Sequence, residues 1–247
     1  MFIPSILHHR SCNSDCNSFM PETFALLCWN VHKNNRKIKR FKPYLKELIE
    51  NEKIDILLFQ EAHFRDNSSC VFPELTYDAA ANLELMNEFY GVLTASKTES
   101  KKAQAYLSQG REIFMGSHKS FLLSLYTFKD GVELLILNVH AINFRENRHY
   151  HQELEMFLEL MSRHKGPMII AGDFNSWNKN RMNRLNDIKE KLGLNAVPFT
   201  KIDRVKSFMG NQLDFIFYRG IELLDFRVIK EHKLSDHNPL LVRFKKI

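Results

Sequence analysis

The stretch Met168-Ile169-Ile170-Ala171-Gly172-Asp173-Phe174-Asn175-Ser176-Trp177 joins a short apolar run to a pair of polar residues. The apolar run predicts a buried strand, and Asp173 and Asn175 follow at its end. Residues two apart on an extended chain point to the same side, so a carboxylate and an amide lie next to each other over one face. This pair suits the positioning of a water molecule beside a phosphate, provided that the rest of the chain supplies the other groups.

Five other predicted strands also begin or end at polar residues that can take part in chemistry. These residues are Asn30 in Cys28-Trp29-Asn30-Val31-His32, Gln60-Glu61, His140, Asp214, and the segment Ser235-Asp236-His237 before the last strand. Each of them alone is explained as easily by a cap, a turn or a satisfied buried polar group. Their recurrence at strand ends indicates one site that several strands build together.

Short apolar runs predict an α/β chain with many strands. The predicted strands are 24–29, 54–59, 91–95, 120–128, 133–139, 167–171, 213–218, 223–229 and 240–244. The predicted helices are 39–52, 145–163 and 181–192. Two pairs of successive strands, 120–128 with 133–139 and 213–218 with 223–229, have no helix between them and predict hairpins. The sheet is therefore expected to be mixed rather than purely parallel.

The length and composition predict one domain with an ordinary core. The chain has 247 residues, of which 44% are hydrophobic, and this is enough for a single core. We expect residues 1–22 to form a poorly ordered leader and residues 23–247 to form the domain. The leader lacks a basic start and a long apolar run, and no segment reaches the roughly 20 apolar residues of a membrane span. A cytoplasmic protein without stable membrane insertion is therefore expected.

The chain is basic, with a formal net charge of +6 and a pI of about 9.1. Such an excess either coats a solvated surface or attracts nucleic acid, phosphorylated ligands or anionic lipid, and charge alone does not choose between them. The four cysteines are Cys12, Cys16, Cys28 and Cys70. Cys28 lies in an apolar run and predicts buried packing. Cys12 and Cys16 lack the second cluster that would support a zinc site, so a reduced compartment is favoured.

The polar residues at the strand ends are carboxylates, amides and imidazoles. Carboxylate and amide oxygens suit Mg²⁺ or Mn²⁺. Mg²⁺ takes one or two carboxylates and fills the rest of its shell with water and substrate phosphate, and Glu61 with Asn30 meets that need. A histidine can contact phosphate or donate a proton, and a nearby aspartate can fix its tautomer. The set therefore predicts phosphate chemistry assisted by a divalent cation.

Taken in order, these motifs resemble the endonuclease/exonuclease/phosphatase superfamily over residues 24–245. The matching motifs are Asn30, Gln60-Glu61, Asn138-Val139-His140, Gly172-Asp173-Phe174-Asn175, Leu213-Asp214-Phe215-Ile216-Phe217 and Ser235-Asp236-His237. A closer likeness is to the bacterial YafD-type proteins. The resemblance implies a four-layer α/β/β/α sandwich with two mixed β-sheets, the deoxyribonuclease-like fold. It also implies that residues 23–247 are a catalytic domain whose site lies where the strand ends of both sheets meet.

The resemblance implies a role for each matched residue in the metal site. Glu61 is expected to hold Mg²⁺ or Mn²⁺, helped by Asn30 and Asp236. The metal is expected to bind a non-bridging oxygen of the phosphate and to stabilise the leaving oxygen.

The other matched residues are implied to handle protons and phosphate. Asp173 is expected to orient and deprotonate the attacking water, and Asn175 to donate to the developing charge. Asp214 is expected to fix His237, which contacts a phosphoryl oxygen or protonates the leaving group. His140 is expected to contact the phosphate from another side. The resemblance leaves both Asp173 and His237 as candidates for the main proton acceptor.

Several further residues are candidates for contacts with the substrate. Lys179, Arg181 and Arg184 follow the Asp173 motif and could contact flanking phosphates, or form a solvated helix face. Trp177 could stack on a base, or pack in the core. Arg111, on the polar stretch 94–112 that predicts a long surface loop, is another candidate for a phosphate contact.

Two more sets of residues have both a functional and an ordinary interpretation. The family also uses a tyrosine near the site, for which Tyr106 and Tyr126 are the candidates. A basic run after Asn30 could lie near the site or simply begin an exposed helix; it comprises Arg36, Lys37, Lys39, Arg40 and Lys42.

Three functions compete on this sequence. The basic balance favours a metal-dependent phosphodiesterase that acts on nucleic acid. A phosphatase or phospholipase C-type hydrolase for a phosphoinositide or sphingolipid is the alternative. The segment Gln212-Leu213-Asp214-Phe215-Ile216 departs from the inositol 5-phosphatase pattern, and no long apolar hairpin is evident. A binding module without catalysis is the third possibility, although every matched position holds the expected residue type. No protein partner is inferred.

Overall fold

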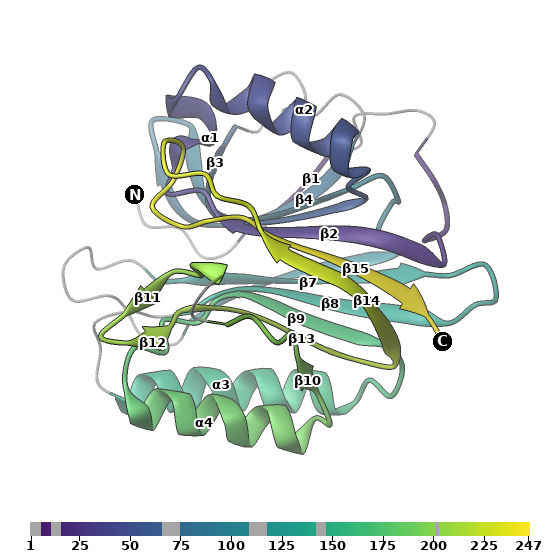
Figure 1. The fold of residues 1–247 in the computed structure, drawn as a ribbon, viewed down its shortest axis with the longest axis vertical. Coiled ribbons are helices and arrows are strands. Elements are labelled where there is room, and N and C mark those ends of the chain that lie inside the picture. Colours follow the sequence, from purple (N-terminus) through teal and green to yellow (C-terminus); the bar gives the residue numbers. More distant parts are fainter. Residues whose placement is uncertain (1–5, 11–15, 66–74, 109–117, 142–146, 201–202) are drawn as a thin grey trace.

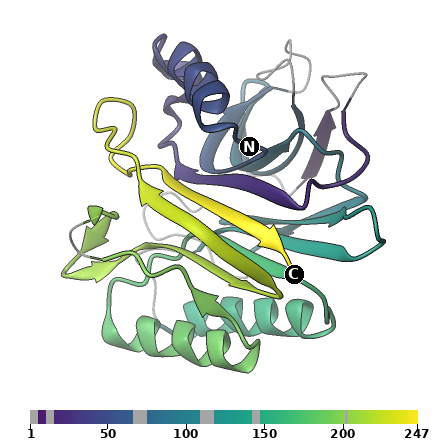
Figure 2. The ribbon, with the colours of Figure 1, turned by 45° about the vertical axis from the view of Figure 1, so that its right-hand side comes forward.

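Two β-sheets pack face to face with helices on the outside of each, in a computed structural model that describes residues 6–10, 16–65, 75–108, 118–141, 147–200 and 203–247 (Figure 1). Helix α2 (Phe41–Glu52) covers the outer face of one sheet, and α3 (Asn147–Ser162) and α4 (Lys179–Lys191) cover the other. Figure 2 shows the same four layers after a rotation. The predicted four-layer α/β/β/α sandwich is therefore confirmed.

The first sheet has seven strands in the order β1-β4-β5-β3-β2-β15-β14. Their bounds are β1 (Ile6–Arg10), β2 (Thr23–Asn30), β3 (Ile56–Phe64), β4 (Thr76–Leu85), β5 (Glu88–Ser96), β14 (Ile221–Val228) and β15 (Leu240–Lys246). Strands β2 and β3 run parallel, and the other neighbours run antiparallel. The sheet is therefore mixed. The one-turn helix α1 (Asn34–Lys37) follows β2.

The second sheet has six strands in the order β10-β13-β9-β8-β7-β6. Their bounds are β6 (Lys102–Leu107), β7 (Ser120–Thr127), β8 (Glu133–His140), β9 (Met168–Asp173), β10 (Asn195–Ala196) and β13 (Asp214–Arg219). Strands β8 and β9 are parallel, which again makes the sheet mixed. A small hairpin of β11 (Ser207–Phe208) and β12 (Asn211–Gln212) lies apart from both sheets.

Strand β2 shows why the central strands are apolar throughout. Its even-numbered residues Phe24, Leu26 and Cys28 pack between the two sheets, and its odd-numbered residues Ala25, Leu27 and Trp29 pack beneath α2. Side chains alternate along a strand, so a strand covered on both faces is buried at every position. This packing confirms the prediction that Cys28 is buried. Cys12 and Cys70 lie outside the described residues.

The helix pair α3 and α4 forms the outer layer over the second sheet. Leu154 and Phe157 of α3 and Leu185 and Ile188 of α4 are buried against that sheet. Their spacing of three places each pair on one helix face, as the sequence pattern predicts. No helix in the described part of the chain combines the length and the apolar character that a bilayer crossing demands.

Three expectations from the sequence differ from the structure. The hairpin predicted from 213–218 and 223–229 is wrong, because β13 lies in the second sheet and β14 in the first. Between them Gly220 adopts a φ of +66°, and Ile221 is buried between the sheets, so the chain crosses from one sheet to the other. The polar stretch 94–112 contains β6, which pairs with β7. The leader contains β1, which covers the edge of β4, and Met20 is buried.

Candidate active site

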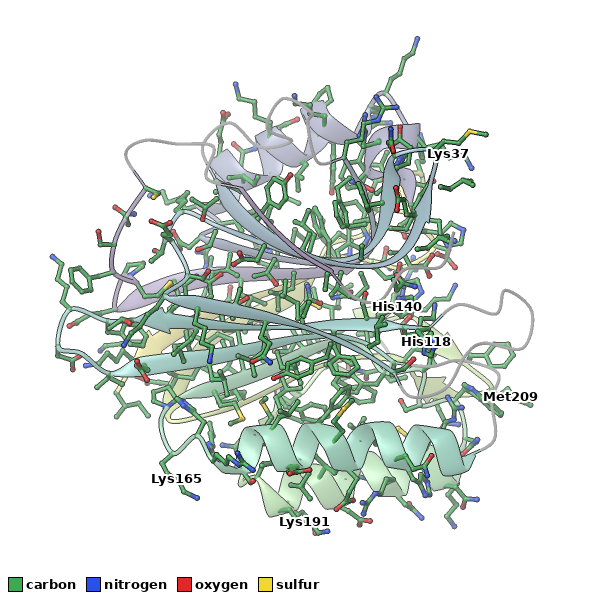
Figure 3. The ribbon with its side chains drawn as sticks, turned by 180° about the vertical axis from the view of Figure 1, so that it is seen from behind. Lys37, His118, His140, Lys165, Lys191 and Met209 are labelled. Atoms are coloured by element: carbon green, nitrogen blue, oxygen red, sulfur yellow. The ribbon has the colours of Figure 1, made fainter. Side chains whose placement is uncertain are left out.

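Five strands of the two sheets place a polar side chain in the gap between the sheets at one end of the sandwich. Each of these residues continues the inward-facing alternation of its own strand: Asn30 on β2, Gln60 on β3, His140 on β8, Asp173 on β9 and Asp214 on β13. Side chains two apart share a face, so the register that packs the core also directs these residues inward. Figure 3 labels His140 at this end, with Met209 of the β11–β12 turn at the same end.

Asp173 lies at the centre of this group. It is opposite Asp214 in the β9–β13 pairing and opposite His140 in the β8–β9 pairing. Asn30 reaches across from the other sheet and donates from Nδ2 to Asp173 Oδ2 at 3.1 Å. Burial and the neighbouring charge of Asp214 raise the pKa of Asp173 above its usual range. A carboxyl group with a raised pKa is a stronger proton acceptor once it is ionised.

Hydrogen bonds hold both the ring and the backbone of His237 in place. Its Nδ1 lies 2.8 Å from Asp214 Oδ2, and its backbone carbonyl accepts from the indole Nε1 of Trp29 at 2.8 Å. Ser235 joins the same loop to β2, because its Oγ donates to the Asn30 carbonyl at 2.7 Å. Burial lowers the pKa of His237, but Asp214 outweighs this effect and the pKa rises to about 9. The ring is therefore protonated near neutral pH, with Nδ1 donating to Asp214.

Glu61 enters the site through an irregularity in β3. The pairing of β3 with β5 shifts between Phe59 and Ala62, and Glu61 has a φ of +50°. Non-glycine residues with positive φ are uncommon and often mark functional positions. The bulge re-aims the side chain, whose Oε1 lies 3.4 Å from Asn30 Nδ2. Burial raises the pKa of Glu61, but neighbouring basic side chains, Lys119 and Lys33 among them, lower it to about 2. The carboxylate is ionised at physiological pH.

Asn175 also adopts a left-handed backbone conformation, with a φ of +49°. Its backbone N–H donates to Asp173 Oδ1 at 3.0 Å, and its Nδ2 donates to the Ala141 carbonyl at 2.8 Å. Gly172 precedes this turn with a φ of +143°, and a Cβ there would lie 2.0 Å from the Val139 carbonyl oxygen. The glycine in the Gly-Asp-Phe-Asn motif is therefore required by the close approach of β8.

A cleft of about 320 Å³ opens above these residues. Its floor holds Glu61, His140, Asp173, Asn175 and His237, and its rim adds His32, Lys119, Trp177, Lys206, Phe208, Leu213 and Asp236. Pockets that combine apolar walls with converging polar groups are the usual places for substrates. The cleft is therefore the candidate active site.

Two lysines of this cleft were missed by the sequence reasoning. Lys119 Nζ lies 3.1 Å from His140 Nε2, and Lys206 Nζ lies 2.8 Å from Asp236 Oδ2. Lysine is common on surfaces, and no local pattern distinguishes these two. Burial and the charge of Lys119 hold the pKa of His140 well below its usual range, so His140 is neutral. His32, which the sequence reasoning did not place in the metal site, lies 3.5 Å from Asp236.

The oxygen-rich floor fits a hard divalent cation. Glu61 is ionised, Asp236 faces the same cleft, and the buried Asp214 Oδ1 has no hydrogen-bond partner among the described residues. Asp173, Asp214 and His237 also bring their ligand atoms within 4.8 Å of one another. We discount His237 as a ligand there, because a metal needs a deprotonated imidazole nitrogen, whereas its Nδ1 donates to Asp214 and its raised pKa keeps Nε2 protonated near neutral pH. Carboxylates therefore make up the candidate metal centre.

Asn30 faces that centre through its amide nitrogen. Its Oδ1 accepts from the backbone N–H of His32 at 3.0 Å, which uses one of the two lone pairs of that oxygen. Its Nδ2 faces Glu61 and Asp173 instead. The structure thus makes Asn30 a bridge that holds the two carboxylates in place.

Arg181 and Arg184 are not among the residues that line the cleft. Arg181 is fully buried, and its Nη1 donates to the Asn175 carbonyl at 3.0 Å. Arg184 pairs with Glu155 of α3 and Asp187. Both side chains are on the inner faces of the helix pair, so the prediction that they contact flanking phosphates is corrected.

The remaining candidates divide between the cleft rim and places away from it. Trp177 lines the cleft, with the Arg181 guanidinium 5.1 Å from its ring centre. Lys179 is exposed at the first turn of α4 and is not among the cleft residues. Tyr126 is buried in the core, and Tyr106 stacks on Phe121. Arg111 lies outside the described residues.

The chain matches a known protein family and is similar to known proteins. Residues 27–237 match the model of the Endonuclease/Exonuclease/phosphatase family. A UPF0294 protein of Yersinia enterocolitica is 33% identical over 234 residues, which cover 91% of this chain and 84% of that protein. UPF0294 proteins are the YafD-type branch.

Solved structures show the same fold at low sequence identity. A family protein from Leptotrichia buccalis has a TM-score of 0.65 and 16% identity, over 90% of this chain and 99% of that one. The D. rerio TDP2 structure complexed with single strand DNA product has a TM-score of 0.63 and 12% identity, over 92% and 100%.

Proposed function

Because the chain belongs to the endonuclease/exonuclease/phosphatase family, we propose that it is a Mg²⁺- or Mn²⁺-dependent hydrolase that cleaves phosphodiester bonds in nucleic acid. One observation carries the proposal: Glu61, Asp173 and the Asp214–His237 pair converge on one cleft from both sheets. The convergence unites an anionic metal ligand, a proton acceptor and a protonated donor.

Glu61 and Asp236 are the residues that would hold the metal, with Asn30 fixing Glu61 from behind. When bound, the ion supplies positive charge to a phosphate oxygen and to the leaving oxygen. Lys206 pairs with Asp236 and neutralises part of its charge, and His32 Nδ1 lies 3.5 Å from Asp236 Oδ1.

Asp173 is proposed as the proton acceptor. Asn30 and the N–H of Asn175 hold its two oxygens, which orients the carboxylate toward a water in the cleft. The water oxygen forms the new bond to phosphorus while its proton passes to Asp173. The phosphorus–oxygen ester bond breaks, and the leaving oxygen takes a proton from the His237 imidazolium. Asp214 keeps that ring charged and aligned.

Nucleic acid is favoured as the substrate by the character of the cleft rim. Lys119 and Lys206 bring positive charge, and Trp177 and Phe208 bring aromatic faces that suit stacking on bases. The chain has a net charge of +6. The D. rerio TDP2 structure, which has the same fold, is complexed with a single strand DNA product.

A lipid phosphodiester is the second candidate substrate. The β11–β12 turn beside the cleft exposes Phe208 at 47% and Met209 at 74%. Exposed apolar side chains beside a site can contact an acyl surface. This observation keeps a phospholipase C-type activity on a phosphoinositide or sphingolipid in consideration.

A substrate panel with Mg²⁺ tests the proposal. It compares the wild type with Asp173→Ala on single- and double-stranded DNA, RNA, abasic DNA, inositol phosphates and sphingomyelin. Cleavage of a nucleic acid that disappears in the variant supports the proposal. Cleavage confined to a lipid would favour the second candidate. A protein that binds neither Mg²⁺ nor Mn²⁺ in a titration would be a binding module instead.

A further inference from the structure

The side chains of Lys119 and His140 contact each other in the cleft. Lys119 Nζ and His140 Nε2 lie 3.1 Å apart. An ammonium group has donors only, so Lys119 donates and the imidazole nitrogen accepts. The lone pair of His140 Nε2 is thereby directed to the lysine, and this nitrogen carries no proton to offer a phosphate oxygen.

The surroundings hold both partners of this contact in place. His140 is 5% exposed, and its backbone lies opposite Asp173 in the β8–β9 ladder. The backbone of Lys119 is fixed to the end of β6, because its N–H donates to Ser108 Oγ and its carbonyl accepts from the Ser108 N–H, each at 2.8 Å. The ammonium group therefore extends into the cleft from a backbone that two hydrogen bonds hold in place.

The position of the pair relates it to the reacting phosphate. His140 Nε2 lies 3.8 Å from Glu61 Oε1 and 3.9 Å from Asp173 Oδ2. The His140 ring thus stands beside the proposed metal ligand and the proposed proton acceptor, and the Lys119 ammonium, 3.1 Å from that ring, is close enough to Glu61 to lower the pKa of its carboxyl group.

We propose that Lys119 is the substrate-contacting residue of this pair. Its ammonium group binds a non-bridging oxygen of the substrate phosphate, and His140 is a positioning residue that aims it. The inference rests on the proposed phosphodiesterase function and revises the role expected of His140 from the sequence.

A double-mutant cycle tests the division of roles. Lys119→Met, His140→Asn and the double variant are compared for kcat and KM with Mg²⁺ and bis(p-nitrophenyl) phosphate. Loss of a charge-assisted hydrogen bond lowers kcat/KM roughly 10- to 100-fold in Lys119→Met. If His140 acts through Lys119, the double variant is no worse than Lys119→Met. Losses that multiply would show that His140 contacts the phosphate independently and would overturn the inference.

Binding of inorganic phosphate, measured by calorimetry at saturating Mg²⁺, separates this inference from the proposed function. The matched control is Lys101→Met, which removes the same charge from an exposed lysine paired with Glu133. We expect weaker phosphate binding in Lys119→Met, wild-type binding in Lys101→Met, and substantial retention in Lys119→Arg. Equal binding by the wild type and Lys119→Met overturns the inference, whether or not the wild type cleaves any phosphodiester. Absence of all cleavage, with phosphate binding that depends on Lys119, defeats only the proposed function.

Discussion

The Nη1 atom of Arg181 donates to the backbone carbonyl of Asn175 at 3.0 Å. Arg181 is fully buried in the first turn of α4, and Asn175 has a left-handed backbone at the cleft. The arginine thus supports the turn that directs the N–H of Asn175 to Asp173. A buried charged group is expensive, so its position under this turn indicates that the geometry of the turn matters.

Replacement of Arg181 by Met is therefore expected to reduce kcat roughly tenfold or more while KM changes little. The Asn175 carbonyl loses its donor, which also lowers the free energy of unfolding by about 1–3 kcal/mol. Steady-state kinetics and urea unfolding measure the two effects. A raised KM with an unchanged kcat would instead favour the phosphate contact predicted from the sequence.

Gly172→Ala is expected to destabilise the protein by more than about 3 kcal/mol. The new Cβ would lie 2.0 Å from the Val139 carbonyl oxygen, and the φ of +143° is unfavourable for alanine. Gly193→Ala is the matched control, since its φ of +63° is also positive but nothing lies within 4 Å of the added Cβ. We expect the control to cost about 1–2 kcal/mol. Equal unfolding free energies for the two variants would refute the steric argument.

The ion pair between Asp214 and His237 predicts a pH-dependent stability. The pKa of His237 is raised from 6.5 to about 9 in the folded state. A raised folded-state pKa gives stability that is fully present below the unfolded pKa and is lost as the pH rises through the folded one. The contribution is about 3 kcal/mol at most.

Urea unfolding of the metal-free protein checks this window. The stability advantage of the wild type over Asp214→Asn should be largest near pH 6 and should shrink between pH 6.5 and 9.5. Titration of the His237 ring by NMR gives the pKa directly. An advantage that stays constant over this range would show that the pair is not charged as described.

The sequence predicts much of this arrangement because strand alternation is a local property. The buried register of β2 and β9 leads directly to Asn30 and Asp173 at their ends, so the core pattern also orients the site. By contrast, the alternation of side chains does not tell which strand a neighbour pairs with. The sequence therefore does not show that the chain crosses from β13 in the second sheet to β14 in the first. Hairpins and crossings between sheets have similar local signals.

Helix faces explain the error at Arg181. A position early in a helix predicts a place near the cleft, but the sequence does not tell which face packs inward. Lys119 shows the opposite case, since its place in the cleft depends on backbone pairing with Ser108, eleven residues away. Such pairing produces no recognisable pattern in the sequence around the lysine.

We propose that Asp173 accepts the proton of the attacking water in a metal-dependent phosphodiester hydrolysis. The most direct measurement is the single-turnover cleavage rate of a nucleic-acid substrate with saturating Mg²⁺, for the wild type and Asp173→Asn. The asparagine keeps the size of the side chain but does not take up the proton. We expect a rate about a thousandfold lower in the variant, with an unchanged free energy of unfolding. A variant rate close to that of the wild type would contradict the proposal.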